Sequence, residues 1–181
     1  GIIFFGKILF INFESTKYKI FSKGHRNIQG LFVKDGLILS TEHGPKGGDE
    51  INKILFGKNY GWPIASYGKK YFSNNFYKHN HYSLGFKEPI YSYVPSIGIS
   101  EIIEIPTEFY KNFENNYLVS SLNGKHLHRI KFDQNFDKVI FDEKIFIGSR
   151  IRDLKYDRTS NSILLALEND GEIGILKALK D

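Results

Sequence analysis

A glycine-rich segment that ends in two carboxylates has the most evident chemistry in this 181-residue sequence. It runs from Glu42 to Asn52 and reads Glu-His-Gly-Pro-Lys-Gly-Gly-Asp-Glu-Ile-Asn. Glycines leave backbone carbonyl groups accessible, and calcium takes oxygen ligands from both carbonyl groups and carboxylates. The acidic residues have the wrong spacing for an EF-hand, and no Gly-Lys-Ser/Thr follows that would make a phosphate-binding loop. The segment is therefore either a calcium-binding loop or an ordinary turn.

The few arginines form a second group of suggestive residues. Only 5 of the 25 basic residues are arginine, so each one marks a position where the planar guanidinium group matters. Arg150 and Arg152 lie two residues apart on a strand-like segment, which puts their side chains on one face. Such a pair can bind a carboxylate or an ortho-quinone oxygen pair at two points. The alternative is an arginine–aspartate lattice built with Asp49 and Asp153.

His126 and His128 form a third candidate because they share one face of a strand-like segment. Two imidazoles on one face can bind a metal ion, but the sequence offers no third ligand nearby. We therefore expect two surface imidazoles here rather than a metal site.

Composition limits the class of protein. The formal net charge is +5 and the pI is about 9.2, but the lysines are scattered, so we expect no nucleic-acid partner. The absence of cysteine excludes disulfides, thiolate zinc sites and thiol catalysis. Because no apolar run approaches about 18 residues, we also expect no membrane span.

The elements that must position these residues are strands. Short apolar or β-branched runs recur between Gly, Asn, Asp and Pro, and no segment has a sustained helical period; Pro106–Phe113 allows one helical turn at most. Asp35-Gly36, between two such runs, is the clearest hairpin signal. The strand-like runs are Ile8–Phe13, Tyr18–Phe21, Gly30–Val33, Leu37–Ser40, Tyr117–Ser120, Leu127–Phe132, Val139–Phe141, Ile151–Tyr156, Ile163–Leu167 and Glu172–Leu176. The sequence predicts an all-β fold.

A strand–connection–strand unit recurs three times, beginning near residues 30, 102 and 154. Each unit ends in a small residue, which suits the crowded inner rim of a ring of sheets. The spacings, about 72 and 52 residues, lie in the range of four-stranded propeller blades with loop insertions. A β-sandwich without internal symmetry is the alternative. Residues 44–81 interrupt the pattern with a long connection rich in glycine, and such connections are usually functional.

Four motifs, read in order, resemble one known family. They are Gly-His-Arg-Asn-x-Gln-Gly from residue 24, Thr-Glu-His-Gly-Pro-x-Gly-Gly-Asp-Glu-Ile-Asn from residue 41, Asn-Tyr-Gly-Trp-Pro from residue 59 and Arg-Ile-Arg-Asp from residue 150. The succession resembles the soluble glucose/sorbosone dehydrogenases, aldose sugar dehydrogenases with pyrroloquinoline quinone (PQQ) and calcium on a six-bladed β-propeller. The resemblance covers residues 7–176 but only the C-terminal half of the family's domain. It implies that residues 1–181 form a partial propeller of about three blades with a long functional loop.

The resemblance implies two calcium sites. Gly44 and Pro45 match the residues whose backbone carbonyl groups hold the calcium ion that bridges to the quinone. That ion would act as a Lewis acid on the reactive quinone carbonyl, and the redox chemistry would belong to the cofactor. Glu50 and Tyr60 match a second, structural calcium site that uses main-chain oxygens.

The resemblance also implies contacts with PQQ. Arg26 and Asn27 match positions beside the cofactor, and Arg150 and Arg152 match the pair that grips it from the opposite blade. Asn123 stands where the family commonly has a lysine. It would bring a hydrogen-bond donor to the cofactor but no charge.

The activity that the resemblance implies is oxidation of the anomeric carbon of aldoses to lactones, with electrons passed to an acceptor. Tyr91 or Tyr93 falls near the family's aromatic wall for the sugar. The family's general base is a histidine of an early blade, upstream of Gly1, and no histidine here matches its motif. This segment alone should therefore turn over poorly. The resemblance implies a periplasmic or secreted protein.

The chain reads as a fragment, since it has no methionine at position 1. Half a propeller would leave open sheet edges, which favour a homodimer or other self-association. The alternative function is a non-catalytic propeller module, stabilised by calcium, that binds carbohydrate or protein.

Overall fold

Antiparallel sheets make up the regular structure of the computed structural model, which describes residues 5–73, 75–169 and 171–178. One four-stranded sheet contains β3 (Ile28–Lys34), β4 (Leu37–Glu42), β5 (Asp49–Lys53) and β6 (Tyr91–Tyr93), and the other contains β7 (Ile99–Glu104), β8 (Asn116–Ser121), β9 (His126–Phe132) and β10 (Val139–Phe146). A three-stranded sheet contains β11 (Ile151–Asp157), β12 (Ser162–Leu167) and β13 (Glu172–Lys177), and a hairpin contains β1 (Lys7–Ile11) and β2 (Tyr18–Lys23). Two single 3-10 turns are η1 (Tyr82–Leu84) and η2 (Lys111–Phe113). The predicted all-β class is confirmed.

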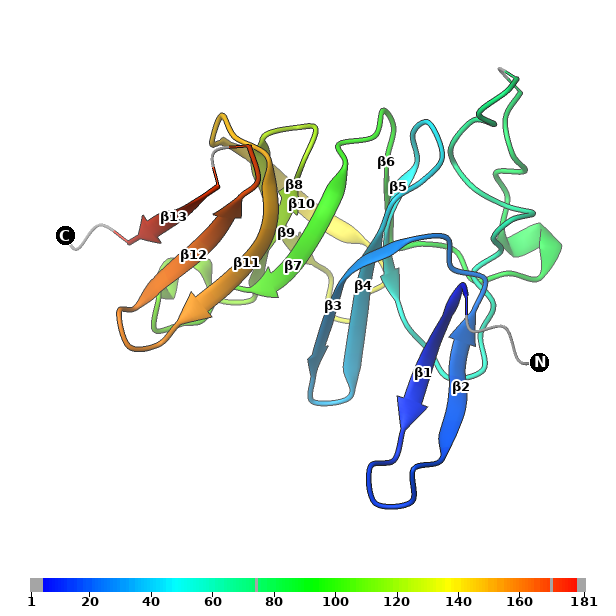
Figure 1. Ribbon diagram of the computed structural model, residues 1–181, viewed down its shortest axis with the longest axis horizontal. Helices are drawn as coiled ribbons and strands as arrows, with labels where there is room; N and C mark the ends of the chain where they lie inside the picture. Colours follow the sequence, from blue (N-terminus) through cyan, green and yellow to red (C-terminus); the bar gives the residue numbers. More distant parts are fainter. Residues whose placement is uncertain (1–4, 74, 170, 179–181) are drawn as a thin grey trace.

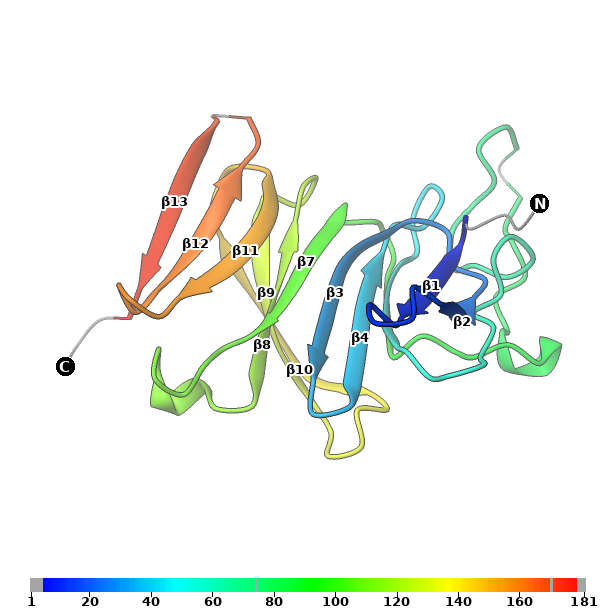
Figure 2. The ribbon, with the colours of Figure 1, turned by 60° about the horizontal axis from the view of Figure 1, so that its bottom comes forward.

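The three larger sheets are arranged as propeller blades. Strand order follows chain order within each of them, so each sheet is a meander. Their first strands, β3, β7 and β11, pack beside one another, as Figure 2 shows. The repeat predicted from the sequence is β3–β4, β7–β8 and β11–β12, the first two strands of each blade. The propeller prediction is confirmed, and the β-sandwich alternative is wrong.

Strands β5 and β6 lack the apolar runs that predicted the other strands. β5 reads Asp-Glu-Ile-Asn-Lys, yet its first four residues are buried. Its backbone pairs with β4 on one side and β6 on the other. Its polar side chains find polar partners inside the protein. A strand of buried polar residues has the composition of a loop, which is why the sequence pattern missed it.

Two apolar clusters hold neighbouring blades together. One lies between the first two blades and includes the fully buried Leu39, Ile99 and Ile130. The other joins the second blade to the β11–β13 sheet and includes the fully buried Leu127 and Ile163. Burying one such side chain contributes about 1.5–3 kcal/mol, so blade-on-blade packing fixes how the blade ends are placed.

Antiparallel alternation brings several connections to one end of the blades. Strands β4, β6, β8 and β10 run toward this end, and β3, β5, β7, β9 and β11 run away from it. Residues 24–27, 43–48, 94–98, 122–125 and 147–150 therefore meet there, at the upper end in Figure 1. We call these five segments the upper rim.

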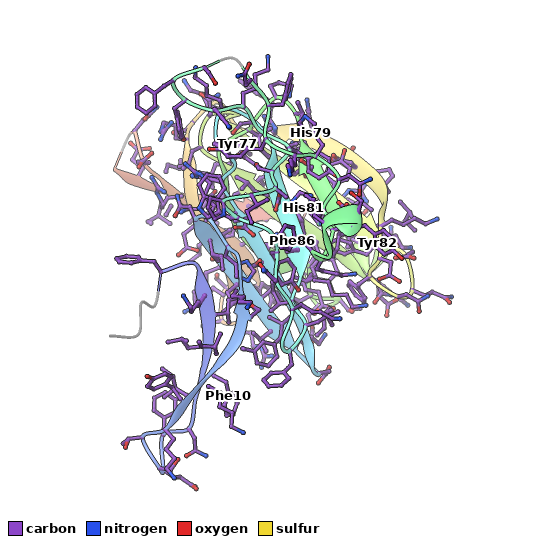
Figure 3. The ribbon with its side chains drawn as sticks, turned by 90° about the vertical axis from the view of Figure 1, so that its right-hand side faces the viewer. Phe10, Tyr77, His79, His81, Tyr82 and Phe86 are labelled. Carbon is purple, nitrogen blue, oxygen red and sulfur yellow. The ribbon has the colours of Figure 1, made fainter. Side chains whose placement is uncertain are left out.

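The long segment, residues 54–90, joins β5 to β6 along the side of the molecule away from β13 (Figure 1). The Tyr60 N–H donates to the Lys23 carbonyl at 2.9 Å, which ties the segment to the chain before β3. Gly61 has a φ of +97°, and a Cβ there would lie 3.0 Å from the His81 ring. The segment is thus packed closely although it is irregular. Figure 3 views it face-on, with Tyr77, His79, His81, Tyr82 and Phe86 labelled.

Apolar side chains are exposed at the two outer sheets. Phe10 and Phe13 of the β1–β2 hairpin are 55% and 90% exposed, and Ile173 and Ile175 of β13 are 63% and 59% exposed. Figure 3 shows Phe10 on the hairpin, away from the labelled residues of the long segment. Within the described residues β13 pairs with β12 alone, so its other edge is open, as the sequence led us to expect. Self-association through this edge stays a prediction. The described residues contain no helix with the length and apolar character needed to cross a bilayer.

Candidate functional site

The glycine loop, residues 43–48, is packed backbone against backbone. A Cβ on Gly44 would lie 2.1 Å from the Gly47 carbonyl oxygen, and a Cβ on Gly68 would lie 2.0 Å from the Pro45 carbonyl oxygen. Real Cβ atoms do not approach oxygen so closely, so Gly44 and Gly68 accept no other residue without rearrangement. Carbonyl groups therefore crowd this corner of the upper rim.

Asp49 ties the glycine loop to the second blade. Its side chain is fully buried, and its Oδ1 accepts a 3.1 Å hydrogen bond from the Gly44 N–H. Its Oδ2 accepts from the Ser96 hydroxyl at 2.7 Å and from the Ile97 and Ile99 N–H groups at 3.0 Å each. Four donors offset the cost of burying the charge. Since none of these donors is an arginine, Asp49 takes no part in the lattice considered above.

A small cavity of about 10 Å³ adjoins the glycine loop, with room for one water molecule or ion. Four residues that the sequence assigned to binding line it: Arg26, Gly44, Glu50 and Tyr60. Glu42, which the sequence analysis did not assign a role, lines it as well. The cavity therefore brings together four of the nine predicted site residues, while Asn27, Pro45, Asn123, Arg150 and Arg152 do not line it.

Two buried carboxylates, Glu42 and Glu50, stand beside this cavity. Asn52 Nδ2 donates to Glu42 Oε1 at 2.7 Å and to Glu50 Oε2 at 3.2 Å. The Arg26 N–H donates to Glu42 Oε2 at 2.8 Å, and His25 Nδ1 lies 3.2 Å from Glu42 Oε1. Burial raises the pKa of the Glu50 carboxyl well above its ordinary value, and the charge of Glu42 raises it further. Oxygen-rich, mutually repelling carboxylates are suited to a hard cation.

Main-chain oxygens would have to complete any ion site at the cavity. The described residues contain no cluster of three or more His, Asp or Glu side chains arranged to ligate a metal. The Tyr60 hydroxyl donates to the Lys53 carbonyl at 2.6 Å and accepts from the Leu55 N–H at 2.9 Å. Burial raises the pKa of Tyr60 to about 12. With its hydroxyl engaged and protonated, Tyr60 offers its backbone carbonyl rather than its side chain.

Arg26 joins the glycine loop to the long segment. Its Nη1 donates to the His43 carbonyl at 2.8 Å, and its Nη2 donates to the Tyr71 hydroxyl at 2.7 Å. The guanidinium carbon lies 5.5 Å from the centre of the Trp62 ring. Arg26 is therefore held in place on both sides of its guanidinium group.

Arg150 and Arg152 converge on one carboxylate. Arg150 Nε donates to Glu168 Oε2 at 2.6 Å, and Arg152 Nη2 donates to Glu168 Oε1 at 2.5 Å. Asp153 instead accepts from the Leu154 N–H at 2.8 Å. The pairing on one face is thus as the sequence predicted, but the arginine–aspartate lattice is wrong. Both arginines instead contact Glu168, which follows β12.

A chain of three hydrogen bonds leads from the arginine pair to the glycine loop. Arg152 Nη1 donates to Gln29 Oε1 at 3.3 Å, and Gln29 Nε2 donates to Asn27 Oδ1 at 3.0 Å. The Asn27 carbonyl then accepts from the His43 N–H at 3.0 Å. The arginine pair does not line the small cavity, but Asn27 stands between the pair and the loop.

Asn123 lies at the exposed tip of the β8–β9 turn, outside the small cavity. The Leu122 N–H donates to the Gly98 carbonyl at 2.7 Å, so the turn adjoins the link that Asp49 holds. Of the two tyrosines considered as a sugar wall, Tyr93 is only 6% exposed and Tyr91 is half-buried. Of these two tyrosines, Tyr91 is therefore the one that is exposed enough to contact a sugar.

His126 and His128 are not two surface imidazoles, as the sequence led us to expect. His128 is only 1% exposed, and the two Nε2 atoms face each other at 2.7 Å. His128 Nδ1 lies 2.5 Å from Asp142 Oδ1, across the β9–β10 pair. The inference failed because strand alternation gives the shared face but does not say which face is buried.

The sequence analysis assigned no role to three residues that contact the predicted site residues: Gln29, Glu42 and Glu168. Gln29 and Glu42 both stand inside the quoted motifs, so their motif membership was an available signal. Glu168 had none, because its contact with the arginines depends on the pairing of β11 with β12. His81, also missed, is fully buried, with Nε2 3.9 Å from Glu50 Oε1.

Successive meander blades, with polar groups gathered at one end of them, define a propeller-type protein. Comparison with known proteins narrows this class. The family described as Glucose / Sorbosone dehydrogenase matches residues 8–176. The chain belongs to this family.

Two relatives and one solved structure illustrate the similarity. The aldose sugar dehydrogenase YliI of Escherichia coli K12 is 30% identical over 169 residues, which cover 91% of this chain and 45% of that protein. Quinoprotein glucose dehydrogenase B of Acinetobacter calcoaceticus is 42% identical over 77 residues, which cover 35% of this chain and 16% of that protein. A crystal structure of a glucose dehydrogenase matches with a TM-score of 0.81 at 27% identity, over 97% of this chain and 55% of that one. The chain spans about half the length of the E. coli enzyme and of this structure.

Proposed function

We propose that this chain is the C-terminal portion of a sugar dehydrogenase that oxidises the anomeric carbon of aldoses to lactones with PQQ and calcium. The chief support is the hydrogen-bonded connection from the arginine pair through Gln29 and Asn27 to the glycine loop. It joins the two motifs that the family resemblance assigns to the quinone. Membership of the family, and a relative named as a quinoprotein, support the same chemistry.

Calcium would be held by oxygen atoms on both sides of the glycine loop. The carbonyl groups of Gly44 and Pro45 would hold the ion that contacts the quinone. Main-chain oxygens of Glu50 and Tyr60 would hold a structural ion. The crowding of carbonyl groups in the loop and the paired buried carboxylates beside the cavity support an oxygen-binding cation.

The arginine pair would bind a carboxylate of PQQ. Glu168 supports this role, because each of its oxygens accepts from one guanidinium group, so the pair fits a planar carboxylate. Arg26 and Asn27 would contact the cofactor beside the glycine loop, and Asn123 would reach it from the β8–β9 turn. PQQ would supply the hydride-accepting carbonyl, while these residues bind and orient it.

The remaining parts of the proposal concern the whole protein. Residues 1–181 would belong to one propeller domain, and the proton-accepting histidine would come from a blade outside this chain. An aldose and an electron acceptor would be the partners. The protein would work in the periplasm or outside the cell, and its exposed outer strands would favour self-association.

A spectral titration tests the proposal. PQQ is added to the protein with excess calcium, and again with a calcium chelator. We expect a saturable change in PQQ absorbance that requires calcium. The absence of any spectral change with calcium present would contradict the proposal.

A second candidate is a non-catalytic module in which calcium has only a structural role. The small cavity beside Glu42 and Glu50 favours it, because an ion there would need no quinone. This candidate predicts that calcium raises the melting temperature and that PQQ adds nothing. A further rise with PQQ would exclude it.

A further inference from the structure

A hydrogen-bonded chain of two imidazoles and a carboxylate lies beneath the β8–β9 turn; His128 is buried, His126 is partly exposed and Asp142 reaches the surface. His126 Nε2 and His128 Nε2 are 2.7 Å apart, and His128 Nδ1 lies 2.5 Å from Asp142 Oδ1. His126 Nδ1 lies 2.6 Å from the Gly124 carbonyl oxygen. The proposed function assigns no role to His126, His128 or Asp142.

The neighbours of the two rings fix where their protons are. The Gly124 carbonyl can only accept, so His126 Nδ1 must carry a hydrogen. The ionised Asp142 carboxylate likewise can only accept, so His128 Nδ1 must carry one too. If both rings were neutral, both Nε2 atoms would then present lone pairs to each other at 2.7 Å. That contact is repulsive, so a cation must lie between the rings.

The distance between the rings identifies this cation as a proton. Two histidine nitrogens on one tetrahedral zinc ion, each at about 2.0–2.1 Å from the metal, would lie roughly 3.3 Å apart. A separation of 2.7 Å instead suits a short N–H···N hydrogen bond. The described residues also contain no three-ligand metal cluster.

The surroundings place the extra proton on His128. Burial lowers the pKa of His126, and the charges of His128 and Lys144 lower it further, against the opposing Gly124 hydrogen bond. His128, in contrast, has the Asp142 carboxylate as its partner. The other titratable groups that face the pair are tyrosines of β6, Tyr91 and Tyr93, whose pKa values burial raises. Both tyrosines stay neutral.

The β8–β9 turn depends on this pair. The His126 ring lies where a side chain at residue 124 would be, since a Cβ on Gly124 would meet His126 Cε1 at 2.3 Å. The Gly124 N–H donates to the Ile97 carbonyl at 2.8 Å. The Lys125 carbonyl accepts from the Gly148 N–H at 2.9 Å. The turn thus links the part of the rim that Asp49 holds to the residues just before Arg150.

We propose that one proton shared by His126 and His128, and stabilised by Asp142, fixes the β8–β9 turn and makes the two histidines positioning residues for Asn123. The inference rests on the proposed function, because that function gives Asn123 its contact with PQQ. Raising the pH removes the shared proton, leaves the two Nε2 lone pairs opposed and releases the turn.

Nitrogen-15 NMR of the imidazole rings tests the proton directly and needs no quinone. At pH 6 we expect His126 neutral with hydrogen on Nδ1, and His128 protonated on both nitrogens. The variant Asp142→Asn keeps the size of the side chain but removes its charge, so the proton should leave at a lower pH than in the wild-type protein. His79→Asn, at an exposed histidine of the long segment, should leave this titration unchanged. Two neutral rings at pH 6, or no shift in Asp142→Asn, would overturn the proposal.

Hydrogen exchange tests the positioning of the turn. The Gly124 amide should exchange at least about tenfold faster in His128→Asn than in the wild-type protein at pH 6, and protection in the wild-type protein should fall as the shared proton is lost. Equal protection in both proteins would overturn the proposal. Saturable zinc binding that disappears in His126→Asn would also overturn it, because a metal would then occupy the place of the proton. If the exchange results hold but PQQ does not bind, the proposed function fails and the proton assignment stands.

Discussion

The two regions to which the sequence assigned binding, the glycine loop with its neighbours and the arginine pair, are built differently. We call them the two halves of the candidate site. The glycine-loop half is buried: Asp49 is fully buried and accepts four hydrogen bonds, and Glu42 is 3% exposed. The arginine half is open, with the side chains of Arg150 and Arg152 34% and 45% exposed and bound to the half-exposed Glu168. Breaking a buried, hydrogen-bonded charge costs about 3–5 kcal/mol, whereas an exposed ion pair contributes about 0–1 kcal/mol.

This contrast indicates that the two regions respond differently to a ligand. The glycine loop is fixed before any ligand binds, since its carbonyl groups and its Asp49 anchor are already in place. The arginines can exchange the Glu168 carboxylate for that of a ligand at small cost. Under the proposed function, a rigid loop that would bind calcium and an adjustable pair of arginines that would bind an anion suit a cofactor that enters a preformed site.

The largest expected effect is on the buried half. In Asp49→Asn, an amide NH₂ must face a backbone or hydroxyl donor whichever way it is turned, because donors surround both oxygens. We expect the free energy of unfolding, measured in urea, to fall by about 3 kcal/mol. Asp35→Asn, the same change at an exposed turn, should alter it by less than about 0.5 kcal/mol. Equal losses in the two variants would show that the buried Asp49 contributes no more to stability than an exposed carboxylate, which would contradict the account of the buried half.

The next largest expected effect is on cofactor binding by the arginine pair. We expect the double substitution Arg150→Gln and Arg152→Gln to weaken PQQ binding about 100-fold, while stability changes by less than about 1 kcal/mol. Arg158→Gln changes an exposed arginine at the other end of the β11–β12 hairpin and should bind PQQ normally. Spectral titration of the three proteins measures these affinities. Unchanged affinity in the double variant would mean that the arginines do not hold the cofactor.

A smaller effect concerns the response of the glycine loop to calcium. Gly44→Ala puts a Cβ against two carbonyl oxygens, so the loop must open. We expect calcium to raise the melting temperature of the wild-type protein by about a few degrees and to leave that of this variant unchanged. Gly36→Ala is the control: its φ of +81° makes the change cost about 1 kcal/mol, but nothing lies within 4 Å of the new Cβ. Its calcium response should persist. Thermal melts with and without calcium distinguish the two.

The smallest effect is on a single titration. Hydrogen bonds from Arg152 and then Arg150 lower the pKa of the Glu168 carboxyl. The ion pair is therefore fully formed above the ordinary glutamate range and is lost as the pH falls through the lowered pKa. In the double arginine variant, carbon-13 NMR should show the Glu168 pKa moving up to the ordinary value. An unmoved pKa would show that the contacts with Glu168 do not persist in solution.

The same contrast explains what the sequence could predict. Short apolar or β-branched runs predicted at least part of every strand in the described residues except β5 and β6. This pattern failed at β5, because the buried Asp49 and Asn52 are polar and form hydrogen bonds that an apolar pattern does not record. The motifs identified Arg26, Gly44 and Glu50, which line one cavity. No local signal shows that Glu168 would face the arginines, or that His128 would be buried, because strand pairing decides both contacts.

The most direct test is a crystal structure of the chain grown with calcium and PQQ. Our account predicts a calcium ion at about 2.3–2.6 Å from the carbonyl oxygens of Gly44 and Pro45, with a PQQ carboxylate in place of Glu168 on Arg150 and Arg152. Calcium bound elsewhere, or both arginines still on Glu168 with PQQ bound at another surface, would contradict it.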